Sequence, residues 1–401
     1  MNPFIAIGQA LQQRGHNVTL VTSNYFDSTI RQAGLNFIPV GSREAYLEII
    51  ENPDLWHPQK SFRFFAEKAV LPYMRPLYEV ITEFDPIETI LVAQGQAFGA
   101  YMAYEKKHYP YATVQLQPAA FRTVFDMPLL PGWMPPLAKH LVFNALDSFL
   151  MDKVLAPQVN AFRAELGLSS VSHIFATLVH SPQRTIGLFP EWFAAPQPDW
   201  PPQTILPGFV YYDQDSNQAG EAELRAFLDE GEAPIVFTPG TAMQHEGDFF
   251  EASIEACELM GRRGILLSKY REQIPAELPT GIKYFDYALF SELLPCTAAI
   301  VHHGGVGTLA QALWAGIPQL IRPMAHDQPE NAARLKNLGV AASLPQNQYR
   351  GPKVAEVLER LINDAIVAAE CRTLAGRIDG ERALEETCLA LEALPVPACS
   401  R

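Results

Sequence analysis

The chain has 401 residues, 48% of them hydrophobic, and a formal net charge of −14 at pH 7. This length allows two or three domains with separate cores. The acidic balance, with no basic stripe to offset it, argues against a nucleic acid as partner. The five cysteines lie in the C-terminal half without CxxC spacing, which favours a reducing, cytoplasmic setting. No uncharged apolar run reaches the roughly 18 residues of a membrane span, and the N-terminal residues lack a signal-peptide pattern.

The chain opens on a predicted helix. Phe4, Ile7, Ala10 and Leu11 recur at helical spacing, and the first strand-like alternation follows over residues 16–22. A doubly wound domain normally begins with a strand that leads into its first helix. We therefore expect an α/β fold that lacks its opening N-terminal strand.

Further strand and helix units fill the rest of the first half. Apolar runs predict strands at residues 36–40, 89–93, 111–116 and 185–189, with a helix at 98–107. This order is typical of a Rossmann-like domain, which we assign to residues 1–200.

A proline-rich segment interrupts these units at residues 127–137. It is too irregular for a core strand, yet it is rich in Leu, Met and Trp, which fits the lining of a hydrophobic acceptor site that includes Trp133 and Met134. The following pattern over residues 137–151 predicts an amphipathic helix that can lie on a membrane surface. Lys139 and His140 are its only basic residues, so we expect electrostatic anchoring to a membrane to be weak.

Prolines and then polar residues mark a linker at residues 201–220. Asp213 and Asp215 form a D-x-D pair of the kind that binds metals, but a solvated linker is the simpler interpretation. Residues 221–378 are expected to form a second Rossmann-like domain, and a last helix at about 379–394 to pack back on the first domain.

The most informative stretch begins after an apolar strand at residues 298–301. The strand leads into His302, His303 and a glycine-rich turn that opens a helix, followed by a short strand at residues 319–321. Glycines in such a turn let the backbone approach a ligand, and the amides of the helix start attract a diphosphate. Asp327 and Gln328 follow the second strand, where α/β sheets bind ligands, and suit the hydroxyls of a sugar. A glycine-rich turn alone would favour plain packing over ligand binding, and the polar residues after the second strand shift the balance toward binding.

The ordered motifs HHGGxGT and P-x-x-x-DQ-x-x-NA-x-R resemble the nucleotide-sugar signature of family 1 glycosyltransferases. The resemblance implies the GT-B fold, in which two Rossmann-like domains face each other across a cleft. It also implies that His302 contacts the donor diphosphate and that Asp327 and Gln328 hold the sugar. The remaining implied donor contacts are Gly240, Thr241, Tyr287, Ala288, Gly304, Gly305, Val306, Gly307 and Thr308.

A metal site is a weaker interpretation of His302, His303, His326 and Asp327. Adjacent histidines point in different directions, and no further ligand stands at metal-site spacing. We therefore expect neither a metal nor a cofactor.

Members of this family begin with a strand and a G-[HD]-x-x-P turn, in which the His or Asp is the general base. Pro3 matches the proline of that turn, so the base would precede Met1. Either the chain has been cut or started late, which we favour, or it is a variant without the base. Gln94, Gly95 and Gln96 stand where the family often has a supporting Asp, and we assign Gln94 and Gln96 to acceptor binding.

The resemblance implies an inverting transfer of a hexose from UDP-glucose or dTDP-L-rhamnose to a lipophilic hydroxyl, as in a hydroxy fatty acid, sterol or polyketide. Residues 54–58 and 191–202 are similar to the branch of rhamnosyltransferases that serve rhamnolipid synthesis. A catalytically silent nucleotide-sugar-binding or partner subunit is the alternative, and a sugar-nucleotide epimerase is a weaker one. We expect a cytoplasmic protein, with at most weak association with a membrane surface.

Overall fold

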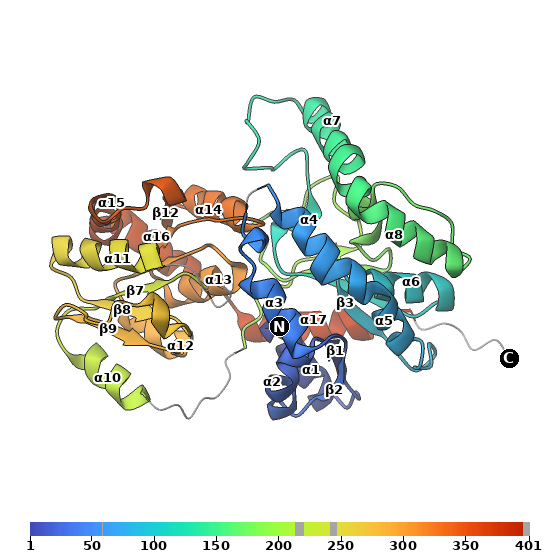
Figure 1. Ribbon diagram of the computed structural model, residues 1–401, viewed down its shortest axis with the longest axis horizontal. Coiled ribbons are helices and arrows are strands. Elements are labelled where there is room, and N and C mark those ends of the chain that lie inside the picture. The colour runs from blue at the N-terminus through green and yellow to red at the C-terminus, as the bar shows by residue number, and fades with distance from the viewer. Residues whose placement is uncertain (58, 213–219, 241–246, 396–401) are drawn as a thin grey trace. The chain divides into compact units, whose positions relative to one another are not determined.

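A computed structural model describes residues 1–57, 59–212, 220–240 and 247–395 of the chain. The chain divides into two compact units, one made of Met1–Tyr212 with Asp379–Arg401 and the other of Asp213–Ile378. Each unit contains parallel strands with helices packed around them (Figure 1). The α/β architecture expected from the sequence is confirmed.

The strands of the first unit form two separate parallel sheets. One has the order β1-β2 and the other β3-β4-β5-β6, and among the described residues no ladder joins β1 to β3. The strands are β1 Thr19–Thr22, β2 Asn36–Pro39, β3 Leu91–Gln94, β4 Tyr111–Gln115, β5 Arg184–Gly187 and β6 Thr204–Ile205.

Helix α1 (Asn2–Gln13) packs against both of these sheets. Its Ile5 belongs to the buried cluster that contains Phe37 of β2. Its Ile7 belongs to the cluster that contains Val114 of β4. Successive positions of this helix therefore contribute to two cores, which explains why it is apolar over more than one face.

The other helices of the first unit surround the strands, and two short π-helices, η3 (Ala66–Val70) and η5 (Asp147–Met151), continue α4 into α5 and α7 into α8. The α-helices are α2 Asp27–Gln32, α3 Arg43–Glu51, α4 Ser61–Phe65, α5 Leu71–Ile81, α6 Phe98–Lys107, α7 Pro136–Leu146, α8 Asp152–Glu165 and α9 Ile174–Leu178.

Helix α17 (Gly380–Glu392) belongs to the first unit although it comes last in the sequence. Its Leu391 is buried in the same cluster as Ile7 of α1. Arg14 closes the contact at the surface with hydrogen bonds to Glu385 and Glu392, the shortest at 2.6 Å. A long-range ion network thus accompanies the apolar contact between the two ends of the chain.

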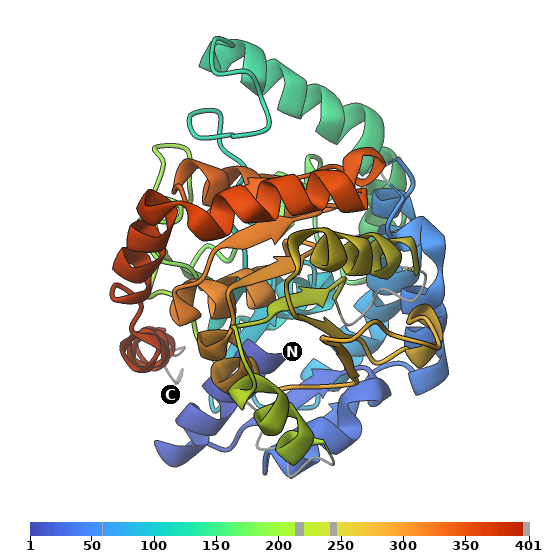
Figure 2. The same cartoon turned by 90° about the vertical axis from the view of Figure 1, so that its left-hand side faces the viewer.

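The second unit has one six-stranded parallel sheet of order β12-β11-β10-β7-β8-β9. Its strands are β7 Ile235–Thr238, β8 Gly264–Leu267, β9 Ile282–Phe285, β10 Ala299–His302, β11 Gln319–Ile321 and β12 Ala341–Ser343. Its helices are α10 Glu221–Asp229, α11 Gly247–Met260, α12 Phe290–Leu293, α13 Val306–Ala315, α14 Gln328–Asn337, α15 Gly351–Asn363 and α16 Ala365–Ala375. Figure 2 shows α11 and α15 beside this sheet.

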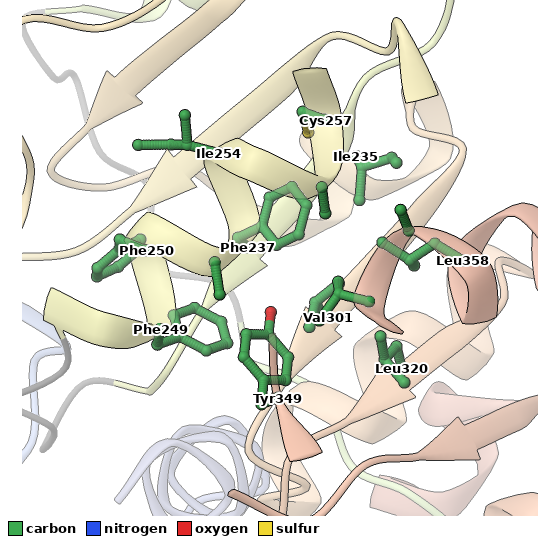
Figure 3. Packing of buried hydrophobic residues seen from close by; sticks show 14 of the residues in the cluster. Ile235, Phe237, Phe249, Phe250, Ile254, Cys257, Val301, Leu320, Tyr349 and Leu358 are labelled. Carbon is green, nitrogen blue, oxygen red and sulfur yellow. The ribbon is translucent and has the colours of Figure 1, made fainter. Parts of the chain in front are cut away.

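The largest buried cluster of the second unit lies between this sheet and helices α11 and α15. The ring of Tyr349 stacks on that of Phe249 with centroids 5.1 Å apart, and its hydroxyl lies 2.8 Å from Ser253 Oγ (Figure 3). Ser253 Oγ in turn donates to the carbonyl of Phe249 in the preceding turn of α11. The stack and the buried hydroxyl pair hold the start of α11 on the core.

Tyr349→Phe is expected to lower the free energy of unfolding by about 0.5–1.5 kcal/mol, the net value of one hydrogen bond, because the ring stack is kept and Ser253 retains its bond to Phe249. Tyr349→Ala should cost about 3–5 kcal/mol, since it also leaves a cavity. Urea unfolding followed by far-ultraviolet circular dichroism measures both changes. Equal losses in the two variants would show that ring packing contributes nothing.

Candidate donor-binding site

Three adjacent strands of the second unit end at the same level of the sheet. His302 of β10 is in register with Thr238 of β7 on one side and Ile321 of β11 on the other. Since the strands are parallel, the segments that follow them emerge at one edge, where open α/β sheets bind ligands. The sequence motifs around residues 240, 303–308 and 322–328 are thereby brought together.

His302 is a buried structural residue. Its ring is 0% exposed, its Nε2 lies 2.9 Å from Gln319 Oε1, and its Nδ1 accepts the backbone N–H of Gly304 at 3.1 Å. These bonds require a neutral ring with the proton on Nε2, and burial lowers the pKa of His302 to about 3. Both ring nitrogens are thus engaged within the protein. The expected contact of His302 with the diphosphate would require the ring to give up one of these two bonds.

His303 lies between two glycines of the site. A Cβ added at Gly240 would lie 2.6 Å from His303 Cε1, and one at Gly305 would lie 2.4 Å from Nε2, so any larger residue would displace the ring. Burial lowers the pKa of His303 to about 4, which keeps the ring neutral at pH 7. Its buried Nδ1 has no partner among the described residues. Because side chains alternate along a strand, the residue after the buried His302 had to face the other way.

The backbone of Gly304 is held on both sides. Its N–H is bound by His302, and its carbonyl accepts the Nδ2 amide of Asn331 at 2.9 Å. Its φ of 93° lies in the left-handed region, and a Cβ there would meet Ile321 at 2.8 Å. Only glycine fits, and the turn is fixed before any ligand binds.

Helix α13 begins directly after this turn. Its N-cap residue Gly305 makes no side-chain cap bond, so the first amides, those of Val306, Gly307 and Thr308, lack the usual intrahelical and capping partners. They form the positive end of the helix dipole, which favours an anion. Gly307 is exposed, and apart from its own helix and adjoining residues a methyl group on its Cα would meet no described atom within 4 Å. Protein packing therefore gives no reason for glycine there.

Asp327 and Gln328 differ in what their side chains do. Gln328 is 3% exposed, and its Oε1 accepts the backbone N–H groups of Met324 and Ala325, so this oxygen shapes the turn that carries Asp327. Asp327 is half-buried and accepts Asn331 Nδ2 at 2.7 Å. Burial raises the pKa of the Asp327 carboxyl. Asn331, which the sequence analysis did not assign, joins Asp327 to the carbonyl of Gly304.

The other expected donor contacts lie on two different strands. Gly240 follows β7 with a φ of 104°, whereas Thr241 is outside the described residues. Tyr287 and Ala288 follow β9, three strands from β10, so a ligand that reaches both ends must span about 14 Å. Ala288 is 9% exposed and its side chain lies in an apolar cluster. Its backbone is therefore the group that can contact the nucleobase of a donor.

The expected acceptor residues belong to the first unit. Gln94 ends β3 and is exposed, while the buried Oε1 of Gln96 has no partner among the described residues. Met134 is half-buried and Trp133 is 82% exposed. The two glutamines therefore sit at a sheet edge, whereas Trp133 is surrounded mainly by solvent.

An aromatic cluster near this sheet was not found from the sequence. Phe121 stacks on Trp200 at 4.4 Å and lies 5.0 Å from the ring of His180. His180 Nε2 contacts the carbonyl of Ala120 at 3.1 Å, and burial lowers the His180 pKa to about 4. The buried His180 Nδ1 and Trp200 Nε1 lack partners among the described residues. Phe121 and Trp200 are only 3% and 6% exposed, so the stack belongs to the packed interior and the two polar atoms are buried within it.

Within the described part of the chain, no group of three or more His, Cys, Asp or Glu side chains is placed so that it could hold a metal ion. The D-x-D pair of Asp213 and Asp215 lies outside the described residues.

Two domain families match the chain. Residues 1–125 match the glycosyltransferase family 28 N-terminal domain, and residues 265–394 match the erythromycin biosynthesis protein CIII-like C-terminal domain. The second match includes all of the described donor-site residues from Tyr287 to Asn331.

Two curated relatives are each 27% identical to the chain. One is an O-mycaminosyltylonolide 6-deoxyallosyltransferase of Streptomyces fradiae, over 98% of this chain and 94% of that protein. The other is a sterol 3-beta-glucosyltransferase of Arabidopsis thaliana, over 95% of this chain. The chain spans 61% of the length of the Arabidopsis enzyme.

Solved structures share the fold. The glycotransferase of kitacinnamycin superposes with a TM-score of 0.72 at 18% identity, over 98% of this chain and 96% of that one. The spinosyn rhamnosyltransferase superposes with a TM-score of 0.67 at 17% identity, over 96% and 95%. At these identities the likeness bears on the fold, which is GT-B.

His302→Asn is expected to flatten the pH dependence of stability. The folded pKa of about 3 lies below the unfolded value near 6.5, so the unfolded chain binds the proton more readily. The stabilisation is complete above about pH 6.5 and is lost as pH falls toward the folded pKa. Between about pH 5.5 and 4, the free energy of unfolding should fall by about 1.4 kcal/mol per pH unit less in His302→Asn than in the wild type. Urea unfolding at several pH values measures this slope.

Gln319→Ala is the matched control for this test. It removes the partner of His302 Nε2 but keeps the titrating ring, so it should lower stability and leave the pH slope as in the wild type. A wild-type slope in His302→Asn would contradict a buried neutral ring.

Gly307→Ala is expected to weaken nucleotide-sugar binding without loss of stability. Alanine favours a helix over glycine by roughly 0.5–1 kcal/mol, so the melting temperature should stay or rise. A methyl in the open space beside Gly307 would occupy the place of a diphosphate on the first turn, and affinity by calorimetry should fall about tenfold or more. Gly132→Ala, also in open space, should change neither quantity. Unaltered affinity in Gly307→Ala would exclude this turn as the anion site.

Proposed function

Because the chain is a glycosyltransferase of the hexosyltransferase class with the GT-B fold, we propose that it moves a hexose from a nucleoside diphosphate sugar to a hydroxyl of a lipophilic acceptor. The observation that carries this proposal is the turn at Gly304, held on both sides and followed by uncapped amides of α13. UDP-glucose and dTDP-L-rhamnose are the candidate donors, and the transfer inverts the anomeric centre.

The donor is held by three groups in this proposal. The amides of the first turn of α13 take the diphosphate, and the neutral His303 adds a hydrogen bond without a second positive charge. The Asp327 carboxylate accepts sugar hydroxyls from the position that Asn331 fixes. His302 and Gln328 keep these groups in place without touching the ligand.

The reaction is a single displacement. The acceptor oxygen attacks the anomeric carbon from the face opposite the diphosphate, the bond from that carbon to the phosphate oxygen breaks, and its electron pair goes to the nucleoside diphosphate. The helix dipole and the loop amides stabilise the charge that develops there. The acceptor proton passes to a general base. Gln94 and Gln96 can hydrogen-bond the acceptor, but an amide cannot take its proton, so the base is a different residue.

A lipophilic acceptor is supported by two observations. Relatives over most of the chain act, by name, on a mycaminosyltylonolide and on sterols. In the first unit, the buried stack of Phe121 and Trp200 lies beside two buried polar atoms that lack partners among the described residues, and a hydroxyl of an apolar ligand can supply the missing hydrogen bonds. A sterol, a polyketide and a hydroxy fatty acid all fit this chemistry.

The rhamnosyl donor rests on narrower support. The stretches at residues 54–58 and 191–202 that resemble rhamnolipid rhamnosyltransferases contain the buried Leu55, Phe193 and Trp200, so part of that likeness reflects packing. A spinosyn rhamnosyltransferase among the structural neighbours agrees with it but shares only 17% identity.

The buried free thiols of Cys257, Cys371 and Cys388 support a cytoplasmic location.

A catalytically silent donor-binding subunit is the second candidate. The observation that favours it is the presence of Gln94 and Gln96 at the end of β3, where the resembled family often has a supporting carboxylate. Product formation separates the two: the enzyme adds the mass of a hexose to a hydroxylated acceptor, whereas a silent subunit only binds the donor.

Calorimetry with UDP-glucose, dTDP-L-rhamnose, UDP and dTDP tests the donor assignment. Asp327→Asn should weaken binding of the matching nucleotide sugar by about 1–3 kcal/mol and leave the affinity for the free nucleotide unchanged, because the carboxylate contacts only the sugar. Mass spectrometry of sterol, macrolide and hydroxy fatty acid mixtures then identifies the acceptor. Binding of none of the four nucleotides would refute the proposal.

A further inference from the structure

Exposed apolar side chains concentrate in one segment of the first unit. Of the fourteen large hydrophobic residues that are exposed in the described part of the chain, nine lie between residues 125 and 150. Six of these line the loop before α7, the outer side of α7 and the following π-helix, and we call them the α7 face: Trp133, Leu137, Leu141, Leu146, Phe149 and Leu150. Trp133 is 82% exposed and Leu137 72%.

The polarity of α7 is the reverse of that of a helix on a soluble protein. Its inward positions are Lys139, Phe143 and, at the start of the π-helix, Asp147, spaced four residues apart. Lys139 is 5% exposed and Asp147 4%, and Asp147 pairs with the Arg122 guanidinium, which also lies over the Phe143 ring. Charged groups therefore anchor the helix to its own unit while leucines face outward. A large exposed apolar patch of this kind marks a site of interaction with another surface.

The carboxylates of this segment also lie away from its exposed side. Of the acidic residues between 125 and 153, Asp126 is half-buried, Asp147 is buried, and Asp152 accepts the backbone N–H groups of His173 and Ile174. The exposed ionisable residues there are His140 and Lys153, with Lys153 Nζ 5.7 Å from the Phe149 ring. Although the chain carries a net charge of −14, this segment keeps its carboxylates away from its exposed side. That pattern suits a membrane surface, which is neutral or negative.

We propose that the α7 face binds the surface of a lipid bilayer, with α7 lying in the plane of the interface. Figures 1 and 2 show α7 standing out from the strands and from the other helices of its own unit. Trp133 occupies the headgroup level, as aromatic residues with one polar atom do. No helix among the described residues is long and apolar enough to cross a membrane. The segment thus lies on the bilayer.

This binding would have one consequence for catalysis, which rests on the proposed function. A sterol or other lipophilic acceptor partitions into the bilayer, so an enzyme on the surface meets it at a far higher local concentration than in water. Vesicle binding itself needs neither donor nor acceptor, so its test stands apart from the test of transfer.

Flotation of the 401-residue protein with phosphatidylcholine vesicles tests the proposal. The wild type should float with the vesicles, and the fluorescence of Trp133 should shift to the blue, a shift that Trp133→Phe removes. Leu137→Ser combined with Leu141→Ser should lower the partition coefficient at least about tenfold, because two large apolar side chains are lost from the interface. Binding should persist at about 0.5 M salt, since the contact is apolar.

Ile366→Ser is the matched control, since Ile366 on α16 is 74% exposed in the other unit. It should bind vesicles as the wild type does. Circular dichroism and melting temperature should be unchanged in every variant, because the altered residues are exposed. Three results would overturn the proposal: no flotation of the wild type, equal loss in Ile366→Ser, or a self-association that the Leu137 and Leu141 changes abolish, which would mean that a second copy covers the face.

Discussion

The second unit depends on the fixation of one residue, Gly304, through the two peptide groups on either side of its Cα. Its N–H is bound by the buried ring of His302 and its carbonyl by the buried amide of Asn331, so neither group is available to a ligand or to water. Unmade hydrogen bonds are costly in such a setting, which keeps the turn in a single conformation. A loop that is rigid before binding loses little entropy when a diphosphate arrives.

This constraint links parts of the sequence that are far apart. The Asn331 amide donates to the carbonyl of Gly304 and also to the carboxyl of Asp327. One side chain therefore positions both the turn proposed to hold the diphosphate and the carboxyl proposed to hold the sugar. His302 reaches Gln319 on the next strand. Movement of any one member would disturb the others, and substitutions in this network should therefore change donor affinity and stability together.

The first unit is built on different contacts. Helix α1 supplies side chains to the cores under both of its sheets, and α17 returns from the end of the chain to the same cluster. Around α7 the usual distribution is reversed, with Arg122 and Asp147 inside and leucines outside. Polar groups hold this segment to the protein, and its apolar residues are left for another surface.

Patterns in the sequence determined the elements and the motif. The strand at β10, the glycine turn and the helix α13 follow from an apolar run, from glycine's freedom at positive φ and from helical spacing, all of which are local properties. Only the tertiary structure decided that His302 is buried and His303 faces the site, that Asn331 joins the turn to Asp327, and that α7 turns its charges inward. Those outcomes depend on partners such as Gln319 and Arg122, which are distant in the sequence and become neighbours only through packing.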